Sequence, residues 1–185
     1  AGHDRGARTA HRLALDHPTR VRKVALLDIV PTRHVWAHTS LEWALGAWHW
    51  SFMAQPEDMF ERMIAAIPAR EFVVRHLGRT GPQGFFDPRA LNEYVRCFTP
   101  KTIHGSCEDY RAAATIDLVH DRDSRAAGDK VQCPMLVLWG AKGRIGAWYD
   151  ALEIWRRYCA AEVTGEAIAT GHYLAEEAPQ EVLDK

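Results

Sequence analysis

Two short runs of unbroken apolar residues constrain the fold of this 185-residue chain more than any other feature. The first run, at 24–27, ends at Asp28, and the second, at 134–139, ends at Gly140. Strands that are apolar on both faces are typical of parallel sheets with helices on each side. A helical pattern at 5–17 precedes the first run. The chain is therefore expected to fold as an α/β protein.

A long block without strand-like runs separates these two parts. Between residues 33 and 123 the apolar residues recur at helical spacing, with helices expected over 41–53, 57–66, 70–77, 89–97 and 107–119. We expect residues 1–32 and 124–185 to form the core and residues 33–123 to form a helical cap inserted into it. After the second apolar run we expect a helix over 148–159, a third strand at 166–169, and a final helix from 179.

Composition excludes several classes of protein. Lys and Arg number 23 against 24 Asp and Glu, so the formal net charge of −1 gives no field that attracts nucleic acid or a membrane. No apolar run reaches the length of a membrane span, and no signal-peptide pattern is present. The four cysteines form no CxxC pair, which favours a reducing compartment. We expect a cytoplasmic protein that acts on a small molecule.

The segment from Gly2 to Gly6, Gly-His-Asp-Arg-Gly, has the spacing of a nucleophile elbow. The strand-to-helix turn of such an elbow brings two backbone segments close together, so the positions two away from the nucleophile must be small. The nucleophile stands at a helix N-terminus, where the helix dipole favours an anion. An ordinary turn before a helix is the alternative interpretation of the same five residues.

The residue at the nucleophile position, Asp4, restricts the reaction. A carboxylate that attacks an sp³ carbon forms an alkyl ester of the enzyme, and water then attacks the carbonyl of that ester. A serine would instead leave an inert ether at the same carbon. An aspartate nucleophile therefore indicates an alkyl halide or an epoxide as substrate rather than an ester.

Hydrolysis of such an ester needs a base and an acid that orients it. His172 follows the last expected strand and is the candidate base, although a capping or surface histidine gives the same pattern. Asp28 is the preferred acid because it ends a strand directly, whereas Asp150 lies inside an expected helix. With Asp4 first, the chain order is nucleophile, acid, base.

Arg5 and Arg8 stand three residues apart in the first turn of the elbow helix, so they share a face. Solvated surface arginines are one interpretation. The other is a clamp for a substrate carboxylate, because guanidinium groups bind carboxylates in a forked geometry.

His34 and His38 have a spacing that is found in metal sites. No HExxH motif surrounds them, so we interpret the pair as part of a polar helix face. No metal site is expected from the sequence.

Six motifs follow one another along the chain: GHDRGAR, LLDIVPT, WHWSFMAQP, CEDYRAAA, LVLWGAKG and TGHYLAEEAP. In this order the chain resembles the fluoroacetate dehalogenases of the α/β-hydrolase superfamily over essentially its whole length. The resemblance implies an α/β-hydrolase fold with a helical cap and hydrolysis of haloacetates to glycolate through an aspartyl ester. It also implies a haloacid substrate, no metal or organic cofactor, and a homodimer for the full-length protein.

The resemblance also assigns roles to individual residues. It implies catalytic roles for Asp4, Asp28 and His172, carboxylate binding for Arg5 and Arg8, and halide binding for His49, Trp50 and Tyr110. A leaving fluoride is strongly basic, and imidazole, indole and phenol groups are donors suited to it. Without the resemblance, aromatic residues on apolar helix faces are typical of a core.

The chain departs from the family at two points. It begins at the elbow, so we expect a fragment that lacks the family's N-terminal strands. Leu77 stands where defluorinating relatives carry a tryptophan, in the cap segment that runs on to Arg79 and Thr80. This difference predicts a shift in preference towards chloroacetate, bromoacetate or larger 2-haloacids.

Two other functions stay open at this stage. An epoxide hydrolase of the same fold uses two cap tyrosines to protonate the epoxide oxygen, and Tyr94 and Tyr110 are available. His49, Trp50 and the paired arginines have no role in that reaction. The other possibility is a truncated, non-catalytic relative whose helical cap only supports association.

Overall fold

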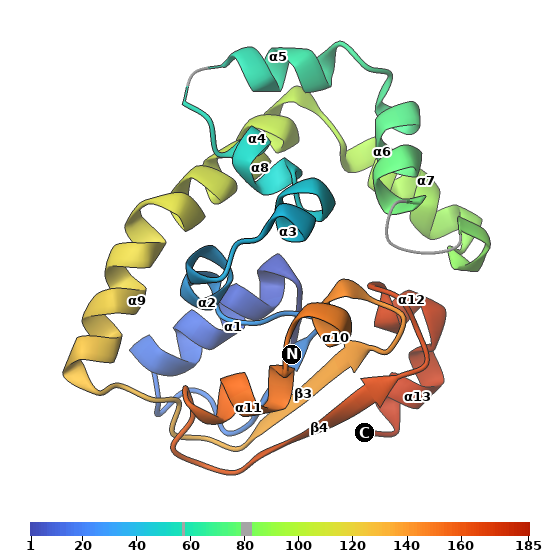
Figure 1. Ribbon diagram of the computed structural model, residues 1–185. Helices are drawn as coiled ribbons and strands as arrows, with labels where there is room; N and C mark the ends of the chain where they lie inside the picture. The colour runs from blue at the N-terminus through green and yellow to red at the C-terminus, as the bar shows by residue number, and fades with distance from the viewer. Residues whose placement is uncertain (57, 79–82) are drawn as a thin grey trace. The chain divides into compact units, whose positions relative to one another are not determined.

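Figure 1 shows the computed structural model, in which residues 1–56, 58–78 and 83–185 are described. Helices account for most of these residues, and the strands form one parallel sheet. In these described ranges, no helix is both long enough and apolar enough to cross a membrane.

The chain divides into two compact units. Unit 1 contains residues 1–31 and 123–185, and unit 2 contains residues 32–122. The limits of unit 2 each lie one residue before those expected for the helical cap.

Unit 1 is built on a four-stranded parallel sheet with the strand order β1-β2-β3-β4. The strands are β1 (Gly2–His3), β2 (Val24–Leu27), β3 (Met135–Gly140) and β4 (Val163–Ile168). The register pairs Leu26 with Val137 and Val137 with Gly165. Both β2 and β3 are mostly buried, as their unbroken apolar sequences predicted.

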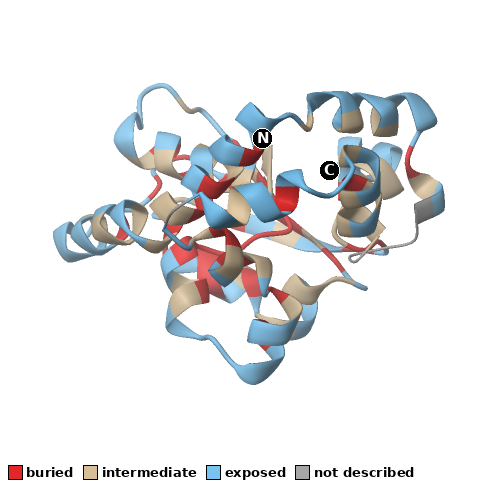
Figure 2. Cartoon of the chain, turned by 90° about the horizontal axis from the view of Figure 1, so that it is seen from above, coloured by how far each residue is buried: buried red, intermediate tan, exposed pale blue. Residues whose placement is uncertain are grey.

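Helices flank this sheet. They are α1 (Arg5–Asp16), α10 (Arg144–Trp148), α11 (Ala151–Arg156), α12 (Leu174–Glu177) and α13 (Pro179–Leu183). Helix α1 packs on β1 and β2, and α11 packs on β3 and β4. On one face of the sheet, Leu27, Leu138 and Ile168 form a buried cluster with Leu174 of α12. Figure 2 shows buried residues, in red, gathered along the strands.

The predicted strands needed two corrections. The sequence predicted three strands, but β1 adds a fourth, which its two residues were too short to signal. The last strand begins at Val163 rather than at 166. This strand lies at the edge of the sheet, and three of its six residues are exposed, so it lacks the apolar run that marks a central strand.

Unit 2 is helical, and its described residues form no strand. Its elements are α2 (Thr32–Ala37), α3 (Leu41–Gly46), α4 (His49–Met53), α5 (Met59–Ala65), α6 (Ala69–Gly78), a 3-10 turn η1 (Gln83–Phe85), α7 (Pro88–Cys97), α8 (Pro100–Ala114) and α9 (Ile116–Ala127), the last of which ends in unit 1. Side-chain caps begin several helices: Ser40 accepts from Trp43 N–H, and Thr99 accepts from Thr102 N–H.

Three of the predicted helices are divided or displaced. The helix expected over 41–53 is split into α3 and α4. The helix expected over 148–159 is the shorter α11, and α10 ends at Trp148 before it. The helix expected over 107–119 begins earlier, because Thr99 caps it and Pro100 suits its first turn. It also breaks at Thr115, whose φ and ψ of −130° and −93° are not helical.

Candidate active site

Asp4 lies in the turn between β1 and α1, where the sequence predicted a nucleophile elbow. Its φ of 48° and ψ of −115° fall outside the regions favoured by residues with a side chain. Such a conformation costs on the order of 1–3 kcal/mol and persists only where the surrounding structure enforces it. Here the Asp4 N–H donates to the carbonyl of Leu27 at 3.0 Å, which ties the turn to the neighbouring strand.

The requirement for small residues around the elbow holds at one of the two predicted positions. A Cβ on Gly2 would lie 2.3 Å from the carbonyl oxygen of Gly6, so only glycine fits there. A Cβ on Gly6 would meet nothing within 4 Å among the described residues. The close approach is therefore between the side-chain position of Gly2 and the backbone of Gly6.

Asp28 lies directly after β2 and is only 2% exposed. Its φ of 50° makes it, with Asp4, one of two described non-glycine residues in the left-handed region. One carboxylate oxygen accepts from the N–H of Gly140 at 2.9 Å, and the other lies 2.5 Å from Nδ1 of His172. Asp150 instead caps α11 by accepting from Glu153 N–H. The structure therefore brings Asp28, and not Asp150, to the candidate base.

The imidazole of His172 lies between two carboxylates. Its Nδ1 faces Asp28, and its Nε2 lies 3.4 Å from a carboxylate oxygen of Asp4. All three residues follow the carboxyl ends of parallel strands, which meet at one edge of the sheet. The three residues that the sequence predicted as nucleophile, base and acid are thus adjacent in unit 1.

The two carboxylates set the protonation state of this group. Burial lowers the pKa of His172, but hydrogen bonds to Asp28 and Asp4 outweigh it and raise the pKa to about 10. Burial raises the pKa of Asp4, but the hydrogen bond and charge of His172, together with the charge of Arg8, hold it well below its usual range. At neutral pH an imidazolium therefore stands beside an ionised Asp4, the form of the carboxylate that can attack carbon.

Arg5 and Arg8 lie on α1 and are both half-buried, so neither is a fully solvated surface arginine. The charge of Arg8 lowers the pKa of Asp4. The same charge acts on Tyr149, whose pKa is raised by burial and lowered by Arg8. Arg8 is thus electrostatically coupled to the candidate nucleophile, and Tyr149 is a neighbour that the sequence did not indicate.

Two further residues around His172 were missed by sequence reasoning. Nε2 of His3 lies 2.7 Å from the His172 carbonyl oxygen. The Glu177 carboxylate accepts from the N–H groups of Gly171 and Tyr173, on either side of His172. Both residues fall within quoted motifs, but only the fold shows that they contact the His172 backbone.

His49, Trp50 and Tyr110, the predicted halide donors, form a cluster of rings within unit 2. The ring centroids of His49 and Tyr110 are 5.7 Å apart, and those of Trp50 and Tyr110 are 6.1 Å apart. His76 on α6 joins this cluster, because its ring lies 5.4 Å from that of His49 in an edge-on arrangement. No sequence signal had indicated His76.

Leu77, the predicted difference from defluorinating relatives, is half-buried at the end of α6. Arg79 and Thr80, which follow it in the same predicted segment, lie outside the described residues. The predicted effect of Leu77 on halide preference stays a prediction.

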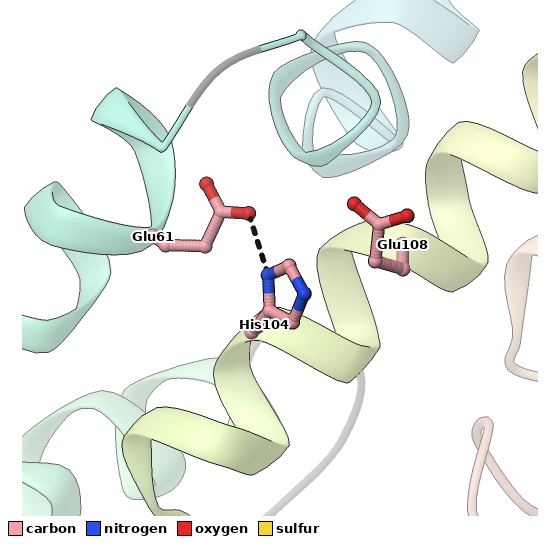
Figure 3. Close-up of side chains that lie close together, drawn as sticks. All are labelled: Glu61, His104 and Glu108. Atoms are coloured by element: carbon pink, nitrogen blue, oxygen red, sulfur yellow. Dashed lines mark ion pairs between the residues drawn. The ribbon is translucent and has the colours of Figure 1, made fainter.

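Figure 3 shows Glu61, His104 and Glu108, side chains of a type that binds metal ions, with ligand atoms within 4.8 Å of one another. The guanidinium of Arg111 lies 2.7 Å from Glu61 and 2.6 Å from Glu108, and it lowers the pKa of Glu61. A cation from the protein therefore already neutralises these carboxylates, and we interpret the cluster as an ion-pair network between α5 and α8. In the pair of His34 and His38, whose spacing in the sequence is one found in metal sites, Nδ1 of His38 lies 2.8 Å from the carbonyl oxygen of His34.

Comparison with known proteins gives a consistent result. The profile of the family described as "alpha/beta hydrolase fold" matches residues 1–179. The chain is 39% identical over 183 residues to a fluoroacetate dehalogenase of Burkholderia sp, covering 97% of this chain and 59% of the relative. The chain thus spans about 60% of the length of the curated relative.

Solved structures confirm the fold. A "putative alpha/beta hydrolase" from Nostoc sp PCC 7120 is 50% identical with a TM-score of 0.93, covering 99% of this chain and 62% of that protein. A "putative epoxide hydrolase" from Pseudomonas aeruginosa is 43% identical with a TM-score of 0.93, covering 99% of this chain and 61% of that protein. The predicted α/β-hydrolase fold and the resemblance to the dehalogenases are both confirmed.

Proposed function

Because the chain belongs to the α/β-hydrolase fold family, we propose that it carries the catalytic groups of a haloacetate dehalogenase. The observation that carries this proposal is the arrangement of His172 between Asp28 and Asp4, with an aspartate at the nucleophile position of the elbow. The resemblance to the Burkholderia enzyme supports the substrate class. Arg5 and Arg8 support it independently, because a haloacetate carries a carboxylate that guanidinium groups bind.

In the first step, a carboxylate oxygen of Asp4 attacks the carbon that bears the halogen. The new C–O bond forms as the carbon–halogen bond breaks, and the halide leaves with its electron pair. Arg5 and Arg8 hold the substrate carboxylate in this proposal. His49, Trp50 and Tyr110 bind the halide, a role that rests on the resemblance and on their clustering in unit 2.

In the second step, water cleaves the ester. Alkylation removes the negative charge of Asp4, which is one of the two groups that raise the pKa of His172. His172 can then release its proton and act as the base, with Asp28 holding its Nδ1. With its first proton lost to solvent, the imidazole takes a proton from water as the water oxygen attacks the ester carbonyl. The bond between this carbonyl carbon and the alkoxide oxygen of glycolate then breaks, and that oxygen takes the proton from the imidazolium. Asp4 is left as a carboxylic acid, passes its proton to His172 and returns to its ionised form.

Epoxide hydrolysis is the second candidate, because the Pseudomonas aeruginosa relative is described as a "putative epoxide hydrolase". That reaction also uses an aspartyl ester but needs acids for the epoxide oxygen. Of the two tyrosines considered, Tyr110 belongs to the His49 cluster, whereas Tyr94 is 39% exposed and contacts Phe86. The two tyrosines therefore have different surroundings, which favours the haloacetate.

The test is release of halide from fluoroacetate and chloroacetate, with diol formation from an epoxide measured in parallel. It is made on the longest protein that carries this chain, because the chain covers only part of its relatives. Halide release from either acid supports the proposal, and release from chloroacetate alone supports the predicted effect of Leu77. Diol formation without halide release replaces the proposal with the second candidate.

The resemblance also motivates a proposed homodimer for the full-length protein, and the cysteine pattern motivates a proposed cytoplasmic location. Light scattering at several protein concentrations tests the first, and cell fractionation tests the second.

A further inference from the structure

We propose that Glu177 is a positioning residue that holds His172 in place for hydrolysis of the ester. This inference rests on the proposed function and deepens it. Glu177 is the last residue of α12 and is half-buried beside the segment that carries the candidate base. Its contacts are with the backbone on both sides of His172 rather than with the imidazole.

The Glu177 carboxylate binds the backbone on both sides of His172. One oxygen accepts from Gly171 N–H at 2.7 Å, and the other accepts from Tyr173 N–H at 3.1 Å. The N–H of Glu177 itself donates to the carbonyl of Tyr173 at 2.8 Å. Both carboxylate oxygens are thus occupied by amides that flank the base, and this fixes the backbone at residues 171–173.

A second contact fixes the same backbone from the elbow. Nε2 of His3 lies 2.7 Å from the carbonyl oxygen of His172, and the two rings are 4.6 Å apart. Burial and the charge of His172 lower the pKa of His3, so at neutral pH it is a neutral ring that donates through Nε2. Glu177 and His3 thereby bind three backbone groups beside the base: the N–H groups of Gly171 and Tyr173 and the carbonyl of His172.

This bracing matters because the imidazole must reach two partners at once. Its Nδ1 meets Asp28 at 2.5 Å while its Nε2 lies 3.4 Å from Asp4. A displacement of about 1 Å at a catalytic group can lower a rate about 100-fold. Only a group with two acceptor oxygens can bind both N–H groups, because the amide of glutamine offers one acceptor and turns a donor towards the other N–H.

The proposal predicts an effect on one step only. Attack by Asp4 needs no base, whereas hydrolysis of the ester needs a correctly placed His172. Glu177→Gln should therefore release about one equivalent of halide in a burst near the wild-type rate. The later steady-state rate should fall about tenfold or more. The alkyl ester should accumulate on the peptide that contains Asp4, where mass spectrometry detects it.

Glu181→Gln on α13 is the matched control, because Glu181 is an exposed glutamate on the next helix. It should leave both the burst and the steady-state rate at the wild-type level. An equal loss of the burst rate and the steady-state rate in a folded Glu177→Gln variant overturns the proposal. Unchanged rates in Glu177→Gln overturn it as well.

A second variant and a second readout keep the test decisive. If Glu177→Gln does not fold, His3→Leu removes the other brace and should give the same selective loss of the steady-state rate. Proton NMR of the Nδ1–H of His172 needs no substrate: its resonance should move in Glu177→Gln and not in Glu181→Gln. An unmoved resonance overturns the positioning role. Absence of halide release by the wild type overturns the proposed function instead. The NMR measurement then still tests whether Glu177 positions His172, because it needs no substrate.

Discussion

The candidate base and acid of unit 1 are joined by a directed hydrogen bond, whereas the candidate halide donors of unit 2 contact one another through their rings. In unit 1, Asp28 contacts His172 at 2.5 Å, and both aspartates lie in strained backbone conformations. In unit 2, His49, Trp50 and Tyr110 meet at centroid distances near 6 Å. Hydrogen bonds fix distance and direction together, while ring contacts tolerate small shifts.

This difference indicates that the candidate groups of the two units have different geometric requirements. A group that transfers a proton or attacks carbon needs a narrow range of geometry, which the sheet edge of unit 1 provides. A group that accommodates a leaving halide needs donors of suitable type, and ring packing allows these to adjust to halides of different size. Substitutions in unit 1 should therefore abolish steps, and substitutions in unit 2 should change preference.

The largest effect is expected at the candidate nucleophile. Asp4→Asn removes the carboxylate that forms the ester, so halide release should fall by at least about 10⁴-fold. Halide release is measured under single-turnover conditions. Asp150→Asn is the control, since Asp150 caps α11 and lies outside the triad. Halide release by the Asp4→Asn variant at the wild-type rate would remove Asp4 as nucleophile.

The second effect separates the two steps. His172→Asn should leave the attack by Asp4 in place and stop hydrolysis, with steady-state turnover falling about 10³-fold or more. Mass spectrometry should then find one carboxymethyl group on the peptide that contains Asp4. His120→Asn, at an exposed histidine of α9, should behave as wild type. Finding no adduct in the His172→Asn variant, with full loss of turnover, contradicts the role of His172 as the base.

The sequence predicts those features of unit 1 that depend on a single strand and the residue that follows it. The apolar runs at β2 and β3 and the acid at Asp28 could be predicted, because a buried parallel strand needs an apolar sequence and its carboxyl end faces the site. β1 and the brace at His3 could not, because β1 is too short to show a pattern and His3 contacts a residue distant in sequence. The brace at Glu177 is a local contact, but no sequence pattern indicates that this carboxylate turns back to the N–H groups beside His172.

In unit 2 the helical character could be predicted but the breaks could not. The split between α3 and α4 and the break at Thr115 interrupt patterns that continue in sequence. His76 joined the ring cluster only once α6 was packed in unit 2. Helical spacing identifies a face, but which residues of different helices meet is decided by packing.

Acid should weaken unit 1 through a residue outside the site. His11 on α1 is buried, and its ring lies 5.0 Å from that of Trp155. Burial, with smaller contributions from Arg12 and Arg8, lowers its pKa to about 4. The unfolded chain, with the ordinary pKa of 6.5, therefore binds this proton first as the pH falls, so the free energy of unfolding decreases between pH 6.5 and about 4.

The expected size of this effect is about 3 kcal/mol at the acid end of the range. Urea unfolding at pH 7 and pH 4 measures it, and the difference between wild type and His11→Leu isolates the contribution of this residue from other titrating groups. His17→Leu, at an exposed position directly after α1, should keep the wild-type dependence on pH. Equal losses in wild type and His11→Leu would contradict the prediction.

The smallest effect is expected in unit 2, and it tests whether the hydroxyl donor of Tyr110 sets the preference between halides. Tyr110→Phe removes one donor while keeping the ring that contacts His49 and Trp50. Fluoride is the more basic leaving group and depends more on each donor, so its release should fall about tenfold while chloride release falls less. Halide-selective electrodes measure both rates with fluoroacetate and chloroacetate. Tyr94→Phe is the matched control, since Tyr94 contacts Phe86 instead. An equal loss for both halides would show that Tyr110 supports the fold of unit 2 and does not discriminate between leaving groups.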